Sequence, residues 1–356
     1  MKTVAIYALC ITILLSLCGC AAGGAEVTGA PAVVPGDIVI DAVGVELAVP
    51  GTDDTTIASV YAVSVPFIVA LELSDRVVAV NYKSQFWADN VEGLREAGSV
   101  GRGIVDIELL AEYDPDVLVH RSNDPRTMDA VGALGIPVMS IRAENYEEII
   151  GTLDLMGRYF HAETRAEEVK AWMDGKVDTL LINTENIPAE KRLTAIVMGG
   201  ELGVVAGGDM LQSWMLETAG AHSLTRNIAG SGDPDAGIPT AWTNIGVESV
   251  FEMNPDVIFC TSSTVLDYTV EEILTSPAWS EVTAVKTGRV ELIPAKWDSW
   301  DIPGISCVLG AMWMQNRMYP EYLPNGALEA EIEDYYNFMF GRTFDEDYLG
   351  YDLGAS

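Results

Sequence analysis

The sequence contains one short unit twice, at positions 140 residues apart. Residues 106–120 read DIELLAEYDPDVLVH, and residues 246–260 read GVESVFEMNPDVIFC. In each copy a residue suited to the helix N-cap precedes apolar residues three apart, and an Asp-Pro or Asn-Pro pair then ends the helix. An apolar run of strand length follows, of the kind that parallel sheets bury. The repeat therefore predicts a chain with two similar α/β halves.

Further apolar runs of strand length flank both copies. They span 76–81 and 137–141 in the first half, and 193–198 and 290–294 in the second. Helical stretches such as 127–134 and 210–219 lie between them, and this alternation argues for an open α/β sheet in each half. With 356 residues, 49% of them apolar, the chain is long enough for two cores. The expected fold class is α/β, with two Rossmann-like lobes whose sheets are mainly parallel.

One long helix is expected between the halves. Residues 164–167 read TRAE, the pattern of a capping box, and apolar residues continue at helical spacing to Leu180. A helix over 164–182 would be roughly 28 Å long. We therefore expect a first lobe at 37–163, a connecting helix at 164–182 and a second lobe at 183–356.

The N-terminal residues have the features of an export signal. Lys2 precedes a charge-free apolar run that is too short to span a bilayer comfortably and that ends in small residues. Residues 17–20 read LCGC, which resembles the lipobox of bacterial and archaeal lipoproteins. We expect a signal peptide at 1–19 and a lipid-modified Cys20 that anchors the protein to the outer face of the cell membrane. A flexible tether rich in Ala, Gly and Pro is expected at 20–36.

The charge of the chain excludes one class of partner. The formal net charge is −33, from 53 acidic residues against 20 Lys and Arg, so nucleic acid is not an expected ligand. Such a surface suits a salt-rich exterior or an acidic cell wall, and it also serves simple solubility. After the signal region no apolar stretch approaches eighteen residues, so the mature chain is expected to be soluble.

Residue types that mark other functions are sparse. The chain has only three histidines, His120, His161 and His222, which are not expected to converge on a bare metal ion. No G-x-S-x-G, H-E-x-x-H, Walker or G-x-G-x-x-G motif is present in a suitable context, so no enzyme activity and no cofactor are expected. Cys260 and Cys307 either form one disulfide or remain two buried thiols.

Several short motifs, in this order, resemble one protein family. They are LSDRVVAV at 73–80, GSVG at 98–101, DPDV at 114–117, LGIPV at 134–138 and NPDVI at 254–258. Together with two lobes, a long helix and a lipid anchor, they resemble the substrate-binding lipoproteins of ABC importers that carry ferric siderophores, haem, cobalamin and, in some members, molybdate or tungstate. The resemblance implies an extracytoplasmic protein that captures a metal chelate, first of all a ferric siderophore. The other ligands, and a ligand-sensing receptor not coupled to transport, stay open.

The resemblance also implies how the protein meets its permease. In this family each lobe presents a surface glutamate to an arginine of the permease dimer. Glu108 and Glu248 occupy the matching positions, each seven residues before the proline of its copy. A glutamate in a first helical turn also stabilises the helix dipole, which is the alternative reason for its presence.

The ligand is expected between the lobes, because ligands of open α/β sheets bind beyond the carboxyl ends of the strands. The candidate residues follow predicted strands or precede the two copies of the repeat. They are Tyr82, Lys83, Phe86, Trp87, Arg102, His120, Arg121, Trp242, Ser262, Lys296, Trp297 and Trp300. Aromatic rings and scattered cations suit a large anionic chelate. The alternative is that the tryptophans pack in the core and that His120 is a buried structural histidine.

Overall fold

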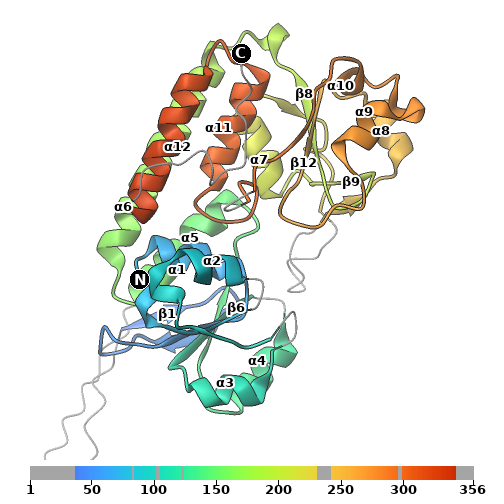
Figure 1. Ribbon diagram of the computed structural model, residues 1–356. Helices are drawn as coiled ribbons and strands as arrows, with labels where there is room; N and C mark the ends of the chain where they lie inside the picture. Colours follow the sequence, from blue (N-terminus) through green and yellow to red (C-terminus); the bar gives the residue numbers. More distant parts are fainter. Residues whose placement is uncertain are drawn as a thin grey trace, which may run out of the picture. The chain divides into compact units, whose positions relative to one another are not determined.

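The first half of the chain is built on a five-stranded parallel sheet. The computed structural model describes residues 37–81, 84–101, 105–121, 124–230, 242–295 and 299–341. Figure 1 shows the arrangement of the elements. The sheet has the order β5-β4-β3-β6-β7, and all of its pairs are parallel. Its strands are β3 (Ile57–Ser59), β4 (Val77–Val80), β5 (Gly98–Ser99), β6 (Val117–Arg121) and β7 (Val138–Ile141). An antiparallel hairpin of β1 (Ile38–Ile40) and β2 (Glu46–Ala48) precedes it.

Helices connect these strands, as the parallel pairing requires. They are α1 (Ser64–Ala70), α2 (Gln85–Asn90), α3 (Ile107–Tyr113), α4 (Pro125–Gly132) and α5 (Tyr146–Tyr159). Two short 3₁₀ helices, Ser74–Arg76 and Glu92–Leu94, flank β4 and α2. The predicted strands 76–81, 116–120 and 137–141 are therefore confirmed as β4, β6 and β7.

The second half carries a mainly parallel sheet of its own. The order is β11-β9-β8-β12-β13, and β10 also pairs with β8. The pairs of β8 with β10 and β12, and of β12 with β13, are parallel, whereas β9 and β11 are joined antiparallel. The strands are β8 (Thr194–Met198), β9 (Val204–Val205), β10 (His222–Ser223), β11 (Thr243–Asn244), β12 (Val257–Cys260) and β13 (Val290–Leu292). The predicted fold class, α/β with two mainly parallel sheets, is confirmed.

The helices of the second half follow the long connecting helix. They are α7 (Leu211–Thr218), α8 (Val247–Met253), α9 (Val270–Thr275), α10 (Thr283–Lys286), α11 (Cys307–Met318) and α12 (Asn325–Phe340), with 3₁₀ helices at Ala189–Lys191 and Pro277–Trp279. Cys260 in β12 and Cys307 in α11 are two buried thiols that are not joined in a disulfide, which is the second of the two predicted alternatives. Within the described residues, no helix is both long and apolar enough to cross a membrane.

The connecting helix α6 (Glu163–Asn186) is longer than the sequence pattern predicts. At 1.5 Å per residue its 24 residues extend about 36 Å. The predicted capping box at 164–167 is wrong: Ala162 occupies the N-cap and no side chain caps the helix. The reason is that His161 takes a left-handed conformation (φ 57°) and turns the chain from α5 directly into α6, so that Thr164 already lies inside the first turn.

The long helix also packs along the last one, as Figure 1 shows for α6 and α12. The Lys176 ammonium of α6 lies 2.5 Å from a Glu331 carboxylate oxygen and 2.6 Å from one of Asp334. Trp172 stacks on Phe338, with ring centroids 5.4 Å apart. The helix α12 of the second half therefore contacts the middle of α6, at Trp172 and Lys176.

The repeated unit is confirmed in its local geometry. Asp106 caps α3 through Leu109 N, and Gly246 caps α8 with φ 78°. Both helices end at a left-handed residue, Asp114 (φ 46°) and Asn254 (φ 47°), which turns the chain into β6 and β12. Each proline is thus preceded by a residue outside the helical region, as its ring requires.

The two copies also make the same long-range contact. The Asp116 carboxylate accepts from Thr56 N (2.8 Å) and Thr56 Oγ1 (2.7 Å), at the start of β3. The Asp256 carboxylate accepts from Thr194 N (2.9 Å) and Thr194 Oγ1 (2.8 Å), at the start of β8. In both halves the repeat therefore pins one strand to its parallel neighbour at the amino ends of the sheet.

Candidate functional site

The carboxyl ends of the first sheet gather several polar residues. Because its strands are parallel, the residues that follow them lie along one edge. Tyr61 follows β3, Asn81 follows β4, and Glu144 lies three residues beyond β7. His120 and Arg121 end β6, where Arg121 pairs with Ile141 of β7.

His120 is a buried histidine at this edge. Its side chain is 5% exposed, and Nε2 lies 3.1 Å from the Asp124 carboxylate. Burial lowers the pKa of His120 despite the opposing effect of Asp124, so the ring is neutral at neutral pH. Its Nδ1 is buried and has no hydrogen-bond partner among the described residues. With Nε2 held by the carboxylate, Nδ1 is the atom left to accept a proton donor.

The end of β7 carries a group of charges that the sequence analysis did not single out. Arg142 Nε lies 2.7 Å from Glu148 Oε1, and Glu148 Oε2 accepts from Glu144 N at 2.8 Å. Burial first, and then the Glu148 charge, raise the pKa of Glu144 to about 7, although Arg142 and Arg121 oppose the shift. The Arg121 side chain itself is exposed. This edge therefore holds an accessible cation beside a carboxyl group that titrates near neutral pH.

The corresponding edge of the second sheet is built around a buried carboxylate. Asp301 is fully buried and accepts from Ser299 Oγ (2.7 Å), Ser262 N (3.3 Å) and Thr261 Oγ1. Burial raises the pKa of Asp301, against the lowering effect of these donors. The predicted ligand residue Ser262 is engaged here, since its Oγ contacts Asp301 Oδ1 at 3.3 Å and Ser299 Oγ at 2.7 Å.

The predicted tryptophans divide between core and edge. Trp300 is 0% exposed and Trp87 only 7%, and Trp87 lies 6.1 Å from Phe340 between ring centroids. The structure thus places both in the core, which is the alternative left open above. Trp242 is half-buried, and a Cβ on Gly199 would lie 2.9 Å from its ring. Gly199 at the end of β8 is therefore what allows Trp242 to lie against this edge.

Other candidates fall outside the described residues. They are Tyr82, Lys83, Arg102, Lys296 and Trp297, together with the side chain of Phe86 and the lipidation site Cys20. No cluster of three metal-binding side chains occurs within the part of the chain that the structure describes. His161 bonds to Pro50 O and His222 lies in β10, so these two side chains belong to separate surroundings.

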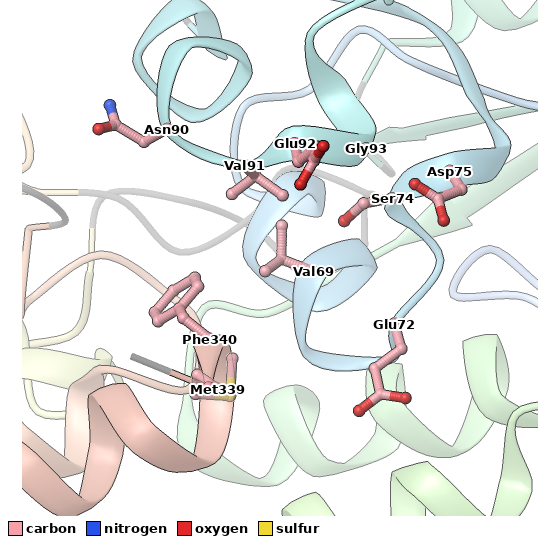
Figure 2. Close-up of a pocket in the computed structure, with 11 residues that line it drawn as sticks. Val69, Glu72, Ser74, Asp75, Asn90, Val91, Glu92, Gly93, Met339 and Phe340 are labelled. Carbon is pink, nitrogen blue, oxygen red and sulfur yellow. The ribbon is translucent and has the colours of Figure 1, made fainter. Parts of the chain in front are cut away.

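A pocket of about 510 Å³ lies away from these edges (Figure 2). Carboxylates of Glu72, Asp75 and Glu92 surround it, above an apolar floor that includes Phe340. Asp75 lies in the 3₁₀ helix Ser74–Arg76, which directly precedes β4, so the pocket lies at the amino end of this strand. Its negative charge and its place disfavour it as a site for an anionic ligand.

The family model of the periplasmic binding proteins, described as "Periplasmic binding protein", matches residues 57–297. The chain belongs to the periplasmic binding protein family. Its members are the solute-binding components of ABC importers and are not enzymes, so the predicted family and the predicted lack of enzyme activity are confirmed. An extracytoplasmic location follows from membership of the family.

This periplasmic binding protein is similar to three known proteins over much of its length. It is 23% identical to the molybdate-binding protein MolA of Haemophilus influenzae over 309 residues, which cover 78% of this chain and 84% of MolA. The structure of MolA bound to molybdate superimposes with a TM-score of 0.72 over 87% of this chain and 99% of that one, at 20% identity. A periplasmic solute-binding protein of Veillonella parvula gives 0.71, at 20% identity, over 88% and 95%. A vitamin B12-binding protein of Yersinia pestis is 25% identical over 53% of this chain and 63% of its own length.

The predicted docking residues of this binding protein occupy equivalent places. Glu108 and Glu248 are each the second residue of a seven-residue helix, α3 or α8, and both are exposed. The helix α3 precedes β6, and α8 precedes β12. These are the two strands that the Asp116–Thr56 and Asp256–Thr194 hydrogen bonds join to their neighbours. Their role in docking remains a prediction.

Sequence reasoning missed three groups at the edges: Tyr61, the Arg142–Glu148 pair with Glu144, and Asp301. The rule that found the other candidates, to read the residues after each strand, would have found Glu144 if applied to 137–141. Tyr61 was missed because β3 is only three residues long and has no period to detect. Asp301 directly follows the predicted residue Trp300.

Proposed function

We propose that this periplasmic binding protein captures a small metal oxyanion of the molybdate or tungstate type and delivers it to an ABC permease. The observation that carries the proposal is the similarity to the molybdate-binding protein MolA over 78% of this chain and 84% of MolA. The ferric siderophore expected from the sequence becomes the second candidate.

The placement of the tryptophans supports a small ligand. A large planar or multidentate chelate needs aromatic faces that are open to it. Trp300 is fully buried and Trp87 nearly so, which removes two of the four predicted tryptophans from such a wall. A tetrahedral oxyanion needs no stacking surface, only a few convergent donors.

The charges at the edge support an anion. In a chain with a net charge of −33, the exposed Arg121 at the end of β6 is a local exception, and its guanidinium suits an oxyanion as a hydrogen-bond donor. In the second half, the hydroxyls of Ser262 and Ser299 already contact the Asp301 carboxylate. The described part of the site is therefore asymmetric, with its accessible cation on the first lobe.

The test is to titrate the protein with a panel of ligands and to measure binding by intrinsic tryptophan fluorescence. The half-buried Trp242 is a suitable reporter. Molybdate and tungstate should each bind with one saturable site, whereas a ferric hydroxamate siderophore, haemin and cobalamin should not. Sulfate distinguishes a metal oxyanion site from a general dianion site. Binding of the ferric chelate in place of molybdate would contradict the proposal and restore the second candidate.

We further propose that Cys20 carries the lipid anchor and that Glu108 and Glu248 dock on the permease. The lipobox-like residues 17–20 support the first, and the equivalent exposed positions in α3 and α8 support the second. Mass spectrometry of the mature protein from its native membrane tests the anchor, since acyl chains should be found on an N-terminal Cys20. An unmodified N-terminus at another residue would contradict it.

A further inference from the structure

Glu144 lies where the first lobe touches a helix of the second. It follows β7 by three residues, and its backbone oxygen accepts a hydrogen bond from Leu211 N at the start of α7 (2.9 Å). Two residues on, Tyr146 stacks on Trp214 of α7 with ring centroids 4.3 Å apart and planes within 9°. The backbone that carries Glu144 is therefore tied to both lobes beside the candidate site.

The carboxyl group of Glu144 is poorly solvated and has no hydrogen-bond donor among the described residues. Its neighbour Glu148 is satisfied, because it accepts from Glu144 N (2.8 Å) and lies 2.7 Å from Arg142 Nε. By contrast, no described residue donates a hydrogen bond to the Glu144 carboxylate. An ionised carboxylate without a donor is costly to bury, whereas the neutral acid is not.

The charged and titratable side chains near Glu144 follow or belong to four elements. Tyr61 follows β3, Arg121 ends β6, Arg142 follows β7, and Glu148 lies in the first turn of α5. The first turn of α7, residues 210–214, contains no titratable side chain. Burial and Glu148 outweigh the two arginines and raise the pKa of Glu144 to about 7. At neutral pH the group therefore exchanges between its two forms.

A fully ionised oxyanion carries hydrogen-bond acceptors and no donors, so each polar group that contacts it must donate. We propose that Glu144 binds the solute in its protonated form, donating its O–H to an oxyanion oxygen beside the Arg121 guanidinium. This inference rests on the proposed oxyanion ligand. The proton comes from solvent and stays on the Glu144 oxygen, so each protein molecule in which Glu144 is ionised takes up one proton when it captures the solute.

The expected pH dependence follows from the sign of the charges. Ionised Glu144 repels a dianion and offsets the attraction of Arg121, so only the fraction of protein with neutral Glu144 binds well. The apparent dissociation constant equals the intrinsic one divided by that fraction. For a pKa of about 7, affinity is constant in acid, falls about tenfold between roughly pH 6 and pH 8, and falls about tenfold per unit above that.

Isothermal titration with sodium molybdate tests the inference on the mature protein. It is run from about pH 6 to about pH 9 in pairs of buffers that differ in ionisation heat, which reports the protons taken up. The wild-type protein should take up about half a proton per molybdate at pH 7 and close to one above about pH 8, given a Glu144 pKa of about 7. The variant Glu144→Gln keeps an N–H donor and cannot ionise, so it should bind equally well at all pH values and take up no proton.

The matched control is Glu147→Gln, which removes an exposed carboxylate from the same first turn of α5 and should keep the wild-type pH profile. A wild-type affinity that does not change with pH, or a Glu144→Gln variant that keeps the wild-type slope, overturns this inference and leaves the molybdate function standing. If molybdate does not bind at any pH, both fall. Because proton uptake is measured on the wild type, the inference is testable even if the variant misfolds.

Discussion

The two halves of this protein are alike at the amino ends of their sheets and different at the carboxyl ends. At the amino ends, Asp116 holds Thr56 and Asp256 holds Thr194 through the same pair of hydrogen bonds. At the carboxyl ends, the first half presents Arg121 and Glu144, whose carboxylate receives no hydrogen bond from a described residue, whereas the second encloses the carboxylate of Asp301 within hydroxyl donors. The repeated contacts hold the strands of both halves in the same way, and the halves differ at the edge where the ligand is proposed to bind.

The equivalence of the two docking glutamates is tested by reversing both charges. The double variant Glu108→Arg, Glu248→Arg should abolish solute uptake in cells, because each new cation would face a cation of the permease. Molybdate affinity of the purified protein should not change, since both side chains are exposed on α3 and α8 and neither is among the proposed ligand-binding residues. Uptake of radiolabelled molybdate or tungstate is the measurement.

The chain offers a matched control for this experiment. Glu112→Arg with Glu252→Arg places the same charges one turn later in α3 and α8, again at exposed and repeat-related positions. These changes should leave uptake near the wild-type rate. If the control pair abolishes uptake as completely as the test pair, the effect is one of general charge and the docking assignment fails.

The enclosed carboxylate of the second half should matter for stability. Asp301→Ala leaves the buried hydroxyl of Thr261 and the half-buried hydroxyls of Ser262 and Ser299 without this acceptor, and we expect a loss of about 3 kcal/mol in the free energy of unfolding. Urea denaturation followed by circular dichroism measures it. Asp267→Ala, at an exposed position in the same half, should cost less than about 0.5 kcal/mol. Equal effects of the two changes would show that the hydroxyl cluster is not structural.

The cation of the first half should matter for affinity instead. Arg121→Gln removes one charged hydrogen-bond donor, and we expect molybdate binding to weaken about tenfold, or by about 1.4 kcal/mol, with little change in stability. Arg158→Gln is the control, because Arg158 is exposed in the last turn of α5, where it pairs with Asp37, and Glu144 precedes the first turn of that helix. Titration calorimetry decides, and an unchanged dissociation constant in Arg121→Gln would remove it from the site.

Removing the aspartate–threonine contact from either half should have the smallest effect on stability, and the effect should be the same in both halves. Asp116→Ala and Asp256→Ala should each lower the free energy of unfolding by about 1 kcal/mol at neutral pH. Hydrogen bonds from Thr56 hold the pKa of Asp116 below its usual value, so its contribution is present above the unfolded pKa and is lost as the pH falls through the folded one. The difference between wild type and Asp116→Ala should therefore vanish in acid. A marked inequality between the two variants at neutral pH would mean that the repeat is not energetically equivalent.

Much of the fold was predictable because its signals are local. Each copy of the repeat carries its own cap, its own stop at Asp-Pro or Asn-Pro and its own buried strand, and the structure has all three in both places. The start of α6 was not predictable in this way. The TRAE pattern at 164–167 has the form of a capping box, but the tight turn at His161 begins the helix earlier.

The site was less predictable, because it depends on the direction in which a side chain points after its strand ends. Trp87 and Trp300 satisfy the same sequence rule as Arg121, yet the two rings turn into the core while the guanidinium faces solvent. Glu144 shows the converse. Nothing in the residues EN at 144–145 distinguishes it from a surface glutamate, and its pKa is raised by burial and by the nearby Glu148 charge, which depend on the tertiary structure.

The central claim, that an oxyanion is held at the carboxyl ends of the sheets, is tested most directly by a crystal structure with molybdate, read from the anomalous scattering of the molybdenum. The account predicts one strong anomalous peak within hydrogen-bond reach of the Arg121 guanidinium and the Glu144 carboxyl group. A peak at the amino ends of the strands, such as in the acidic pocket of Figure 2, or no peak in crystals of protein saturated with molybdate, would contradict it.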